Sequence, residues 1–174
     1  MEDLRYPIGK FEYIGMSVIQ RTEWIEVLEQ FPNRLEQEVA KMTETQLDTP
    51  YRPDGWTMRQ VIHHLADALM NSYIRFKLAM TESNPTIKPF DPDGWVNTVD
   101  SRYGAVASSV AIIQGVTTKL VHLLRGMEQT DFHRQFYHPE RGSQVKLAYF
   151  LGWTAWHVEH HLAHITSGLQ RLDK

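Results

Sequence analysis

Apolar residues recur at intervals of three or four positions in four stretches of this chain, which is the spacing of one face of an α-helix. The pattern predicts helices over residues 22–42, 57–80, 107–127 and 145–172. Thr57 and Gln60 begin the second helix as a capping box, because each side chain can bond the backbone amide of the other residue. Pro32 lies within the first pattern and has no amide hydrogen, so this stretch is either one kinked helix or a helix interrupted near Pro32.

The segments between these helices favour turns. Residues 83–94 contain three prolines and a glycine, which predicts a long crossover loop between the second and third helices. Residues 131–143 are polar and predict an extended turn or a short hairpin. The last helix would be roughly 40 Å long, similar to the second and third. We therefore expect residues 1–174 to form one all-α domain, a four-helix bundle with a long crossover.

Composition excludes several classes of function. There are 18 lysine and arginine residues against 21 aspartate and glutamate residues, so the chain shows no electrostatic footprint for nucleic acid or for an anionic membrane. The absence of cysteine excludes disulfides, thiolate metal ligands and a cysteine nucleophile. No secretory signal is visible, and no apolar run approaches the ~18 residues of a membrane span. These features predict a protein of a reducing compartment without nucleic-acid or membrane partners.

Histidines are the most informative residues, because six of the nine fall in two short segments, 63–64 and 157–164. In the second predicted helix, His64 follows Val61 by three positions and precedes Ala68 by four, which places it on the apolar stripe. His63 falls on a largely polar face and is expected to be solvated. A single core histidine is most often a hydrogen-bonded packing residue, so His64 alone does not establish a site.

The last predicted helix carries two pairs of histidines at a spacing of four. His157 and His161 share a face that includes the apolar stripe, and their imidazoles would lie ~6 Å apart. His160 and His164 form a second pair, which periodicity disfavours but leaves open. Four histidines within eight residues have no solvation rationale, because lysine or glutamate would serve an exposed face better.

One histidine from the second helix and two from the last would form a metal site with His64, His157 and His161 as ligands. Three neutral imidazoles leave a coordination position of a divalent ion open for water, as in catalytic rather than structural sites. Imidazole binds zinc, nickel, copper and iron(II), so the ligand type does not select the metal. No catalytic acid or base can be assigned, since Glu159 points roughly 160° away from the histidine pair around the helix.

Two further residues are candidates for substrate binding. Asn71 and Arg75 follow His64 by seven and eleven positions, so they could line the same cavity and hold an anionic or amide group. A surface ion pair would also explain Arg75. The tryptophans at positions 56, 95, 153 and 156 are expected to serve core and loop packing.

A family resemblance covers nearly the whole chain. It is carried by Gly55-Trp56-Thr57, by Arg59-Gln60-Val61-Ile62-His63-His64-Leu65-Ala66-Asp67, by Phe136-Tyr137-His138-Pro139, and by Trp156-His157 with His160-His161-Leu162-Ala163-His164. These segments resemble the DinB-like superfamily of metal-binding four-helix bundles, and most closely its YfiT branch, whose members are named as metal-dependent hydrolases. The resemblance implies that His64, His157 and His161 bind zinc or nickel in a cytoplasmic, often homodimeric protein. Leu69 departs from the branch, where members carry a histidine.

Three functional hypotheses follow. The first is a metal-dependent hydrolase that holds one divalent ion per chain, zinc or else nickel, and activates water against a small-molecule substrate. The reaction in this hypothesis comes from the resemblance. The second is S-transfer of a low-molecular-weight thiol at the same ion, since some DinB-like bundles resemble bacillithiol transferases. The third is a metal-stabilised helical bundle without enzymatic activity.

Overall fold

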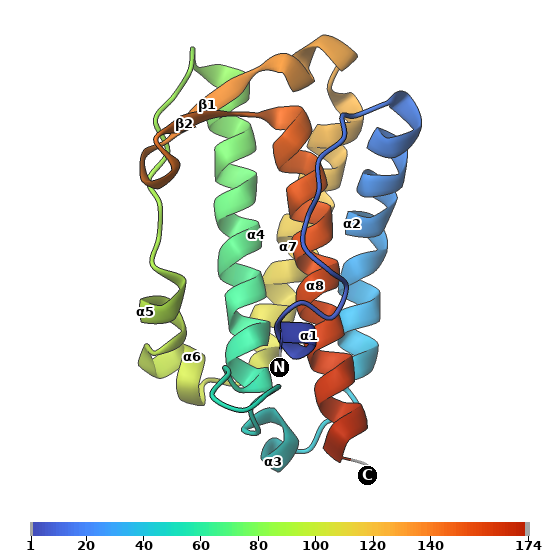
Figure 1. Ribbon diagram of the computed structural model, residues 1–174, viewed down its shortest axis with the longest axis vertical. Coiled ribbons are helices and arrows are strands. Elements are labelled where there is room, and N and C mark those ends of the chain that lie inside the picture. The colour runs from blue at the N-terminus through green and yellow to red at the C-terminus, as the bar shows by residue number, and fades with distance from the viewer. Residues whose placement is uncertain (1, 173–174) are drawn as a thin grey trace.

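The computed structural model describes residues 2–172 and contains four long helices that lie side by side (Figure 1). They are α2 (Val18–Val39), α4 (Met58–Thr81), α7 (Val106–Gly126) and α8 (Leu147–Leu172). Helices α2 and α4 each pack against both α7 and α8, so the four helices form a closed ring around one core. The predicted four-helix bundle is confirmed.

The connection between α4 and α7 runs the length of the bundle. Helix α4 ends and α7 begins at opposite ends of the molecule, so these two neighbouring helices run in the same direction (Figure 1). The chain returns along the outside of α4 and forms α5 (Pro92–Val96) and α6 (Val99–Tyr103) on its way. The predicted crossover is therefore present, but it includes two short helices that were not predicted. Pro92 begins α5 instead of breaking it, because proline suits the first turn of a helix.

Short elements lie at the two ends of the bundle, except α1 (Glu2–Arg5), which lies against the side of α8. The remaining elements are α3 (Glu44–Leu47), η1 (Gln129–His133), β1 (Gln135–His138), η2 (Pro139–Arg141) and β2 (Ser143–Lys146). Strands β1 and β2 form an antiparallel hairpin in which the buried side chains of Phe136 and Val145 lie opposite each other. The predicted hairpin is thus confirmed. Because it extends to Lys146, α8 begins two residues later than predicted.

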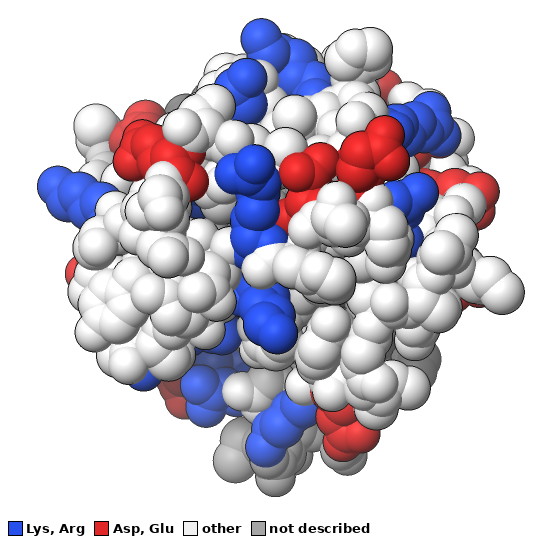
Figure 2. Space-filling view, turned by 90° about the horizontal axis from the view of Figure 1, so that it is seen from above, with Lys and Arg blue, Asp and Glu red and all other residues white. Residues whose placement is uncertain are grey.

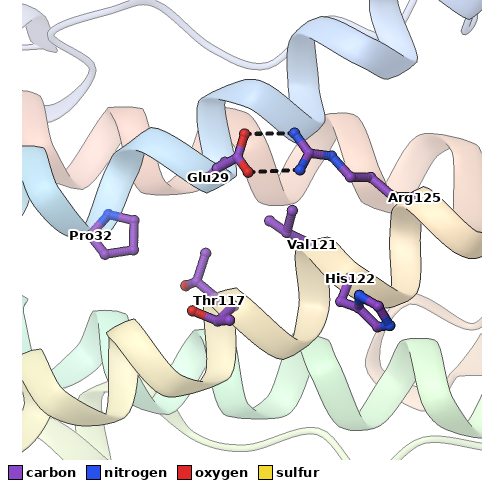
Figure 3. A pocket seen from close by; sticks show the side chains of 7 residues that line it. Glu29, Pro32, Thr117, Val121, His122 and Arg125 are labelled. Atoms are coloured by element: carbon purple, nitrogen blue, oxygen red, sulfur yellow. Dashed lines mark hydrogen bonds and ion pairs between the residues drawn. The ribbon is translucent and has the colours of Figure 1, made fainter.

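Helix α2 continues through Pro32 without interruption. Figure 3 shows Pro32 facing Thr117 of α7, one helical turn from the bidentate ion pair between Glu29 and Arg125. Proline inside a helix costs about 3 kcal/mol. Burial of Leu28 and Phe31, both fully enclosed in the core on this part of α2, outweighs that cost, since each such side chain contributes about 1.5–3 kcal/mol.

Helix α7 is more apolar than its neighbours. An 18-residue window of this helix has a mean hydropathy of 1.3, which meets the length and composition criterion for a membrane span, although only 28% of that window is buried. No membrane span was predicted from the sequence. In the structure α7 lies between α2 and α4, where Ile113 and Leu120 are fully buried. Packing within the bundle accounts for these two positions, whereas Ile112 of the same helix is 37% exposed.

Candidate metal centre

Two neighbouring helices bring three imidazoles to one point. His64 projects from the second turn of α4, and His157 and His161 project from successive turns of α8. The Nε2 atom of His157 lies 3.3 Å from that of His64 and 3.2 Å from that of His161. Each of the three histidines offers one nitrogen within 4.8 Å of the others. The structure therefore brings together the three histidines that the sequence analysis selected.

The spacing of these nitrogens fits a divalent ion. Two nitrogens that each lie about 2.05 Å from zinc in tetrahedral geometry are about 3.3 Å apart. Direct hydrogen bonding explains the arrangement less well, because Nε2 of His157 faces two other Nε2 atoms. A neutral imidazole nitrogen carries either one hydrogen or one lone pair, so it cannot make a good bond to both. The donor set thus fits a metal ion with an open coordination position.

Burial keeps the three imidazoles neutral, as metal ligation requires. It lowers the pKa of His64 to about 4. Burial also holds the pKa values of His157 and His161 well below their usual range, and the neighbouring histidines reinforce this effect. At neutral pH each ring therefore has one nitrogen lone pair to offer.

A fourth histidine fixes the orientation of His161. Nε2 of His164 lies 3.1 Å from the carbonyl oxygen of Arg5, which can only accept, so this nitrogen carries the hydrogen. Burial lowers the pKa of His164 to about 4, so its Nδ1 is a bare acceptor at neutral pH. The Nδ1 atoms of His164 and His161 are 3.3 Å apart, which requires His161 to donate there. The lone pair of His161 Nε2 consequently points toward the other two ligands.

The alternative pair also lies close to His161. One nitrogen of each of His160, His161 and His164 falls within 4.8 Å of the other two. His160 stacks on Trp156 with ring centroids 4.6 Å apart, and its Nδ1 is buried without a partner among the described residues. His164 already uses both ring nitrogens, on His161 and on Arg5. The set of His64, His157 and His161 therefore remains the stronger candidate.

The prediction that His63 is solvated is wrong. His63 is buried, with Nδ1 2.7 Å from the hydroxyl of Ser109 and Nε2 3.2 Å from the carbonyl oxygen of Gly104. The junction between α6 and α7 covers this face of α4. Periodicity could not indicate this cover, because it reports the polarity of a helix face and not what packs on it.

Glu159 lies away from the histidines, as predicted. Its Oε2 accepts a hydrogen bond of 3.0 Å from Arg34 of α2. The position of Leu69 is also plain, since it lies in the hydrophobic core, 1% exposed. Neither residue contributes a group to the candidate centre.

The tryptophans do more than the packing that was predicted for them. Trp153 stacks on His157 with ring centroids 4.6 Å apart, and Trp56 lies 4.9 Å from His64. Trp56 is itself held by a 3.0 Å hydrogen bond from its Nε1 to Asp93. These contacts hold the two imidazoles in place from the side. The sequence could have indicated one of these contacts, because Trp153 precedes His157 by one helical turn and therefore shares its face of the helix.

A cavity of about 500 Å³ opens beside the three histidines and extends along the groove between α4 and α8. Its other end is lined by Arg75 of α4, with His138 and Glu140 from the hairpin. The structure thus places Arg75 in the cavity. It places Asn71 outside, with its side-chain amide 2.9 Å from the carbonyl oxygen of Asp67. His138 had not been selected, and its Nδ1 is buried without a partner among the described residues.

Comparison with known proteins agrees with this geometry. The model of the DinB superfamily matches residues 27–165. "Putative metal-dependent hydrolase YfiT" of Bacillus subtilis is 46% identical over 171 residues, which cover 98% of this chain and 96% of that protein. A protein of Bacillus mycoides with the same description is 48% identical over 174 residues, 99% of either chain.

A solved structure of a relative has the same fold as this chain. The solved structure of YfiT, described as "a probable metal-dependent hydrolase with an unusual four-helix bundle topology", matches with a TM-score of 0.95 and 45% identity over 98% of both chains. The three-histidine cluster in this chain could bind the metal that such names imply. The chain belongs to the DinB superfamily, and its near relatives are the YfiT proteins.

Proposed function

We propose that this chain is a metal-dependent hydrolase in which His64, His157 and His161 hold one divalent ion, zinc or else nickel. The observation that carries the proposal is the convergence of three neutral Nε2 atoms at the wall of a cavity of about 500 Å³, which suits a small-molecule substrate. The descriptions of the relatives support hydrolysis as the reaction. A bound ion would supply Lewis acidity and would lower the pKa of water towards ~7.

The surrounding side chains support this chemistry. The rings of Trp56 and Trp153 line the histidine end of the cavity, and such apolar surroundings strengthen electrostatic interactions there. His164 holds the ring of His161 in the required tautomer. Burial lowers the pKa of His160 to about 4, so at neutral pH this cavity residue is a neutral imidazole and adds no positive charge beside the ion.

Metal analysis tests the ligand set. We expect the purified, tag-free protein to bind about one zinc ion per chain. His157→Ala should abolish this stoichiometry, whereas the matched variant His160→Ala should retain it. Full zinc content in His157→Ala would overturn the assignment, and loss in His160→Ala alone would transfer the site to the alternative histidine pair.

Turnover by the zinc-loaded protein tests the reaction. We expect hydrolysis of members of a panel of small amides and esters, lost in His157→Ala. Titration of the cobalt-substituted protein with a small thiol separates the rival reaction. A thiolate-to-cobalt absorption band without hydrolysis would favour S-transfer of a low-molecular-weight thiol. Zinc-dependent stability with no turnover of either kind would leave a metal-stabilised bundle.

A further inference from the structure

Arg75 places a positive charge in the cavity wall, where no described residue forms an ion pair with it, although the charge of Glu140 acts on it from nearby. It is only 8% exposed, and its Nε is buried without a hydrogen-bond partner among the described residues. Its guanidinium lies over the ring of Phe150, whose centroid is 6.0 Å from Cζ. Arginine stays protonated, and a buried charge is costly when no counter-charge contacts it directly. Because such a group lowers the stability of the fold, we expect a bound ligand to supply the hydrogen bonds and the contacting counter-charge that Arg75 lacks.

The surroundings of Arg75 indicate the charge of that ligand. His138 and Glu140 line the same end of the cavity, and the charges of both Glu140 and Arg141 act on Arg75, with opposite effects. Figure 2 views the molecule from the end at which the hairpin lies and shows Lys and Arg side chains in a central band with Asp and Glu side chains on both sides of it. The carboxylate of Glu140 would repel a dianion more strongly than a monoanion. A planar carboxylate matches both the single guanidinium fork and this mixed field.

Helix geometry gives the distance from Arg75 to the histidines. The guanidinium lies at the level of Phe150, which precedes His157 on α8 by seven residues. Seven residues of helix correspond to a rise of about 10 Å. On the α4 side the cavity floor between the two ends consists of small side chains, Ala68 and Ser72, whereas Trp153 lines the cavity from α8. An extended chain of about three residues would span this distance.

We propose that Arg75 binds a carboxylate of the substrate while the reacting group of the same molecule lies about 10 Å away, beside His64, His157 and His161. The substrate class is therefore a small carboxylate of the size of an acylated dipeptide. The reaction at the histidine end rests on the proposed function, whereas the carboxylate site rests on the geometry of Arg75.

Two probes that differ in one charge test this proposal. Octanedioic acid monohydroxamate carries a metal-binding group at one end and a carboxylate at the other, and its terminal carboxamide lacks only the charge. By calorimetric titration of the zinc-loaded protein, we expect the carboxylate to bind about 10- to 100-fold more tightly. The preference should vanish in Arg75→Gln. It should persist in Arg141→Gln, which removes an equal charge outside the cavity lining.

Each result decides the matter. Equal affinities in the wild type, a preference that survives in Arg75→Gln, or an equal loss in both variants would overturn the assignment to Arg75. If Arg75→Gln fails to fold, Arg75→Lys should keep part of the preference for the carboxylate probe, because lysine keeps the charge but lacks the planar guanidinium. Loss of the whole preference in Arg75→Lys would also overturn the proposal.

A metal-free titration separates this proposal from the proposed function. Octanoate and octanamide are the probes, since neither needs the ion. An Arg75-dependent preference for octanoate supports the carboxylate site even if the protein binds no zinc. No preference in the metal-free protein, combined with normal zinc binding, would overturn the carboxylate site and leave the metal centre intact.

Discussion

Replacing His164 with phenylalanine tests whether one imidazole fixes the orientation of another. His164 bonds the carbonyl oxygen of Arg5 through Nε2 and accepts from His161 through Nδ1. Phenylalanine keeps an aromatic ring to stack on Tyr51, where the ring centroids are 3.9 Å apart, but it removes both polar contacts. The variant therefore disturbs the tautomer of His161 without removing any of the three proposed ligands.

The expected loss follows from these contacts. Removing the hydrogen-bond partner of a metal-bound histidine lowers metal affinity about 10- to 100-fold, or roughly 1.4–2.8 kcal/mol. The nitrogen–nitrogen distance of 3.3 Å is at the long end of hydrogen bonding, so we expect the lower limit of this range. The lost bond to Arg5 should separately lower the free energy of unfolding by about 1 kcal/mol.

Zinc affinity is measured by competition with a chromophoric chelator at pH 7, and stability by urea unfolding of the metal-free protein. His160→Phe is the matched control. It keeps a ring against Trp156 and removes a nitrogen that has no partner among the described residues, so zinc affinity should not change. Wild-type zinc affinity in His164→Phe would refute the reasoning. An equal loss in His160→Phe would show that ring packing, and not the hydrogen bond, sets the affinity.

Two further variants test buried polar groups away from the metal centre. Burial, with a smaller contribution from Asp100, raises the pKa of the half-buried Asp67 to about 6, so this residue's contribution to stability is lost as pH rises from about 4 to 6. Asp67→Asn should therefore gain about 1 kcal/mol at pH 7, after allowance for solvent screening, and nothing below pH ~4; a gain of equal size at both pH values by urea unfolding would contradict this. The Thr117 hydroxyl, 1% exposed, has no partner among the described residues. Thr117→Val should add about 1 kcal/mol by the same assay, and a loss would mean that solvent in the groove of Figure 3 bonds the hydroxyl.

The sequence could predict the face of each helix but not the segment that covers it. His157 and His161 were found because a spacing of four fixes their relative direction on any helix. His63 was missed because its polar face is covered by the junction near Gly104, more than forty positions away. The contact of Trp56 with His64 depends equally on tertiary structure, since the capped turn ahead of α4 folds back over the second turn of that helix.

Helix propensity and periodicity alone could not predict the roles of three single residues. Pro32 left a helix break open, whereas burial of its neighbours keeps α2 continuous. Arg75 and Asn71 were equivalent by periodicity, but only Arg75 reaches the cavity. Asn71 satisfies its amide on the preceding turn of its own helix, an option that a short polar side chain has and arginine lacks.

The small residues on the cavity floor make substrate length an adjustable property. Ala68 and Ser72 lie between the histidines and Arg75, and neither belongs to the main hydrophobic core. A larger side chain at either position would shorten the free path between the two ends while leaving both sets of binding groups intact. Homologous bundles could therefore diverge in the molecules they accept through one or two substitutions on α4, without rebuilding the fold that carries them.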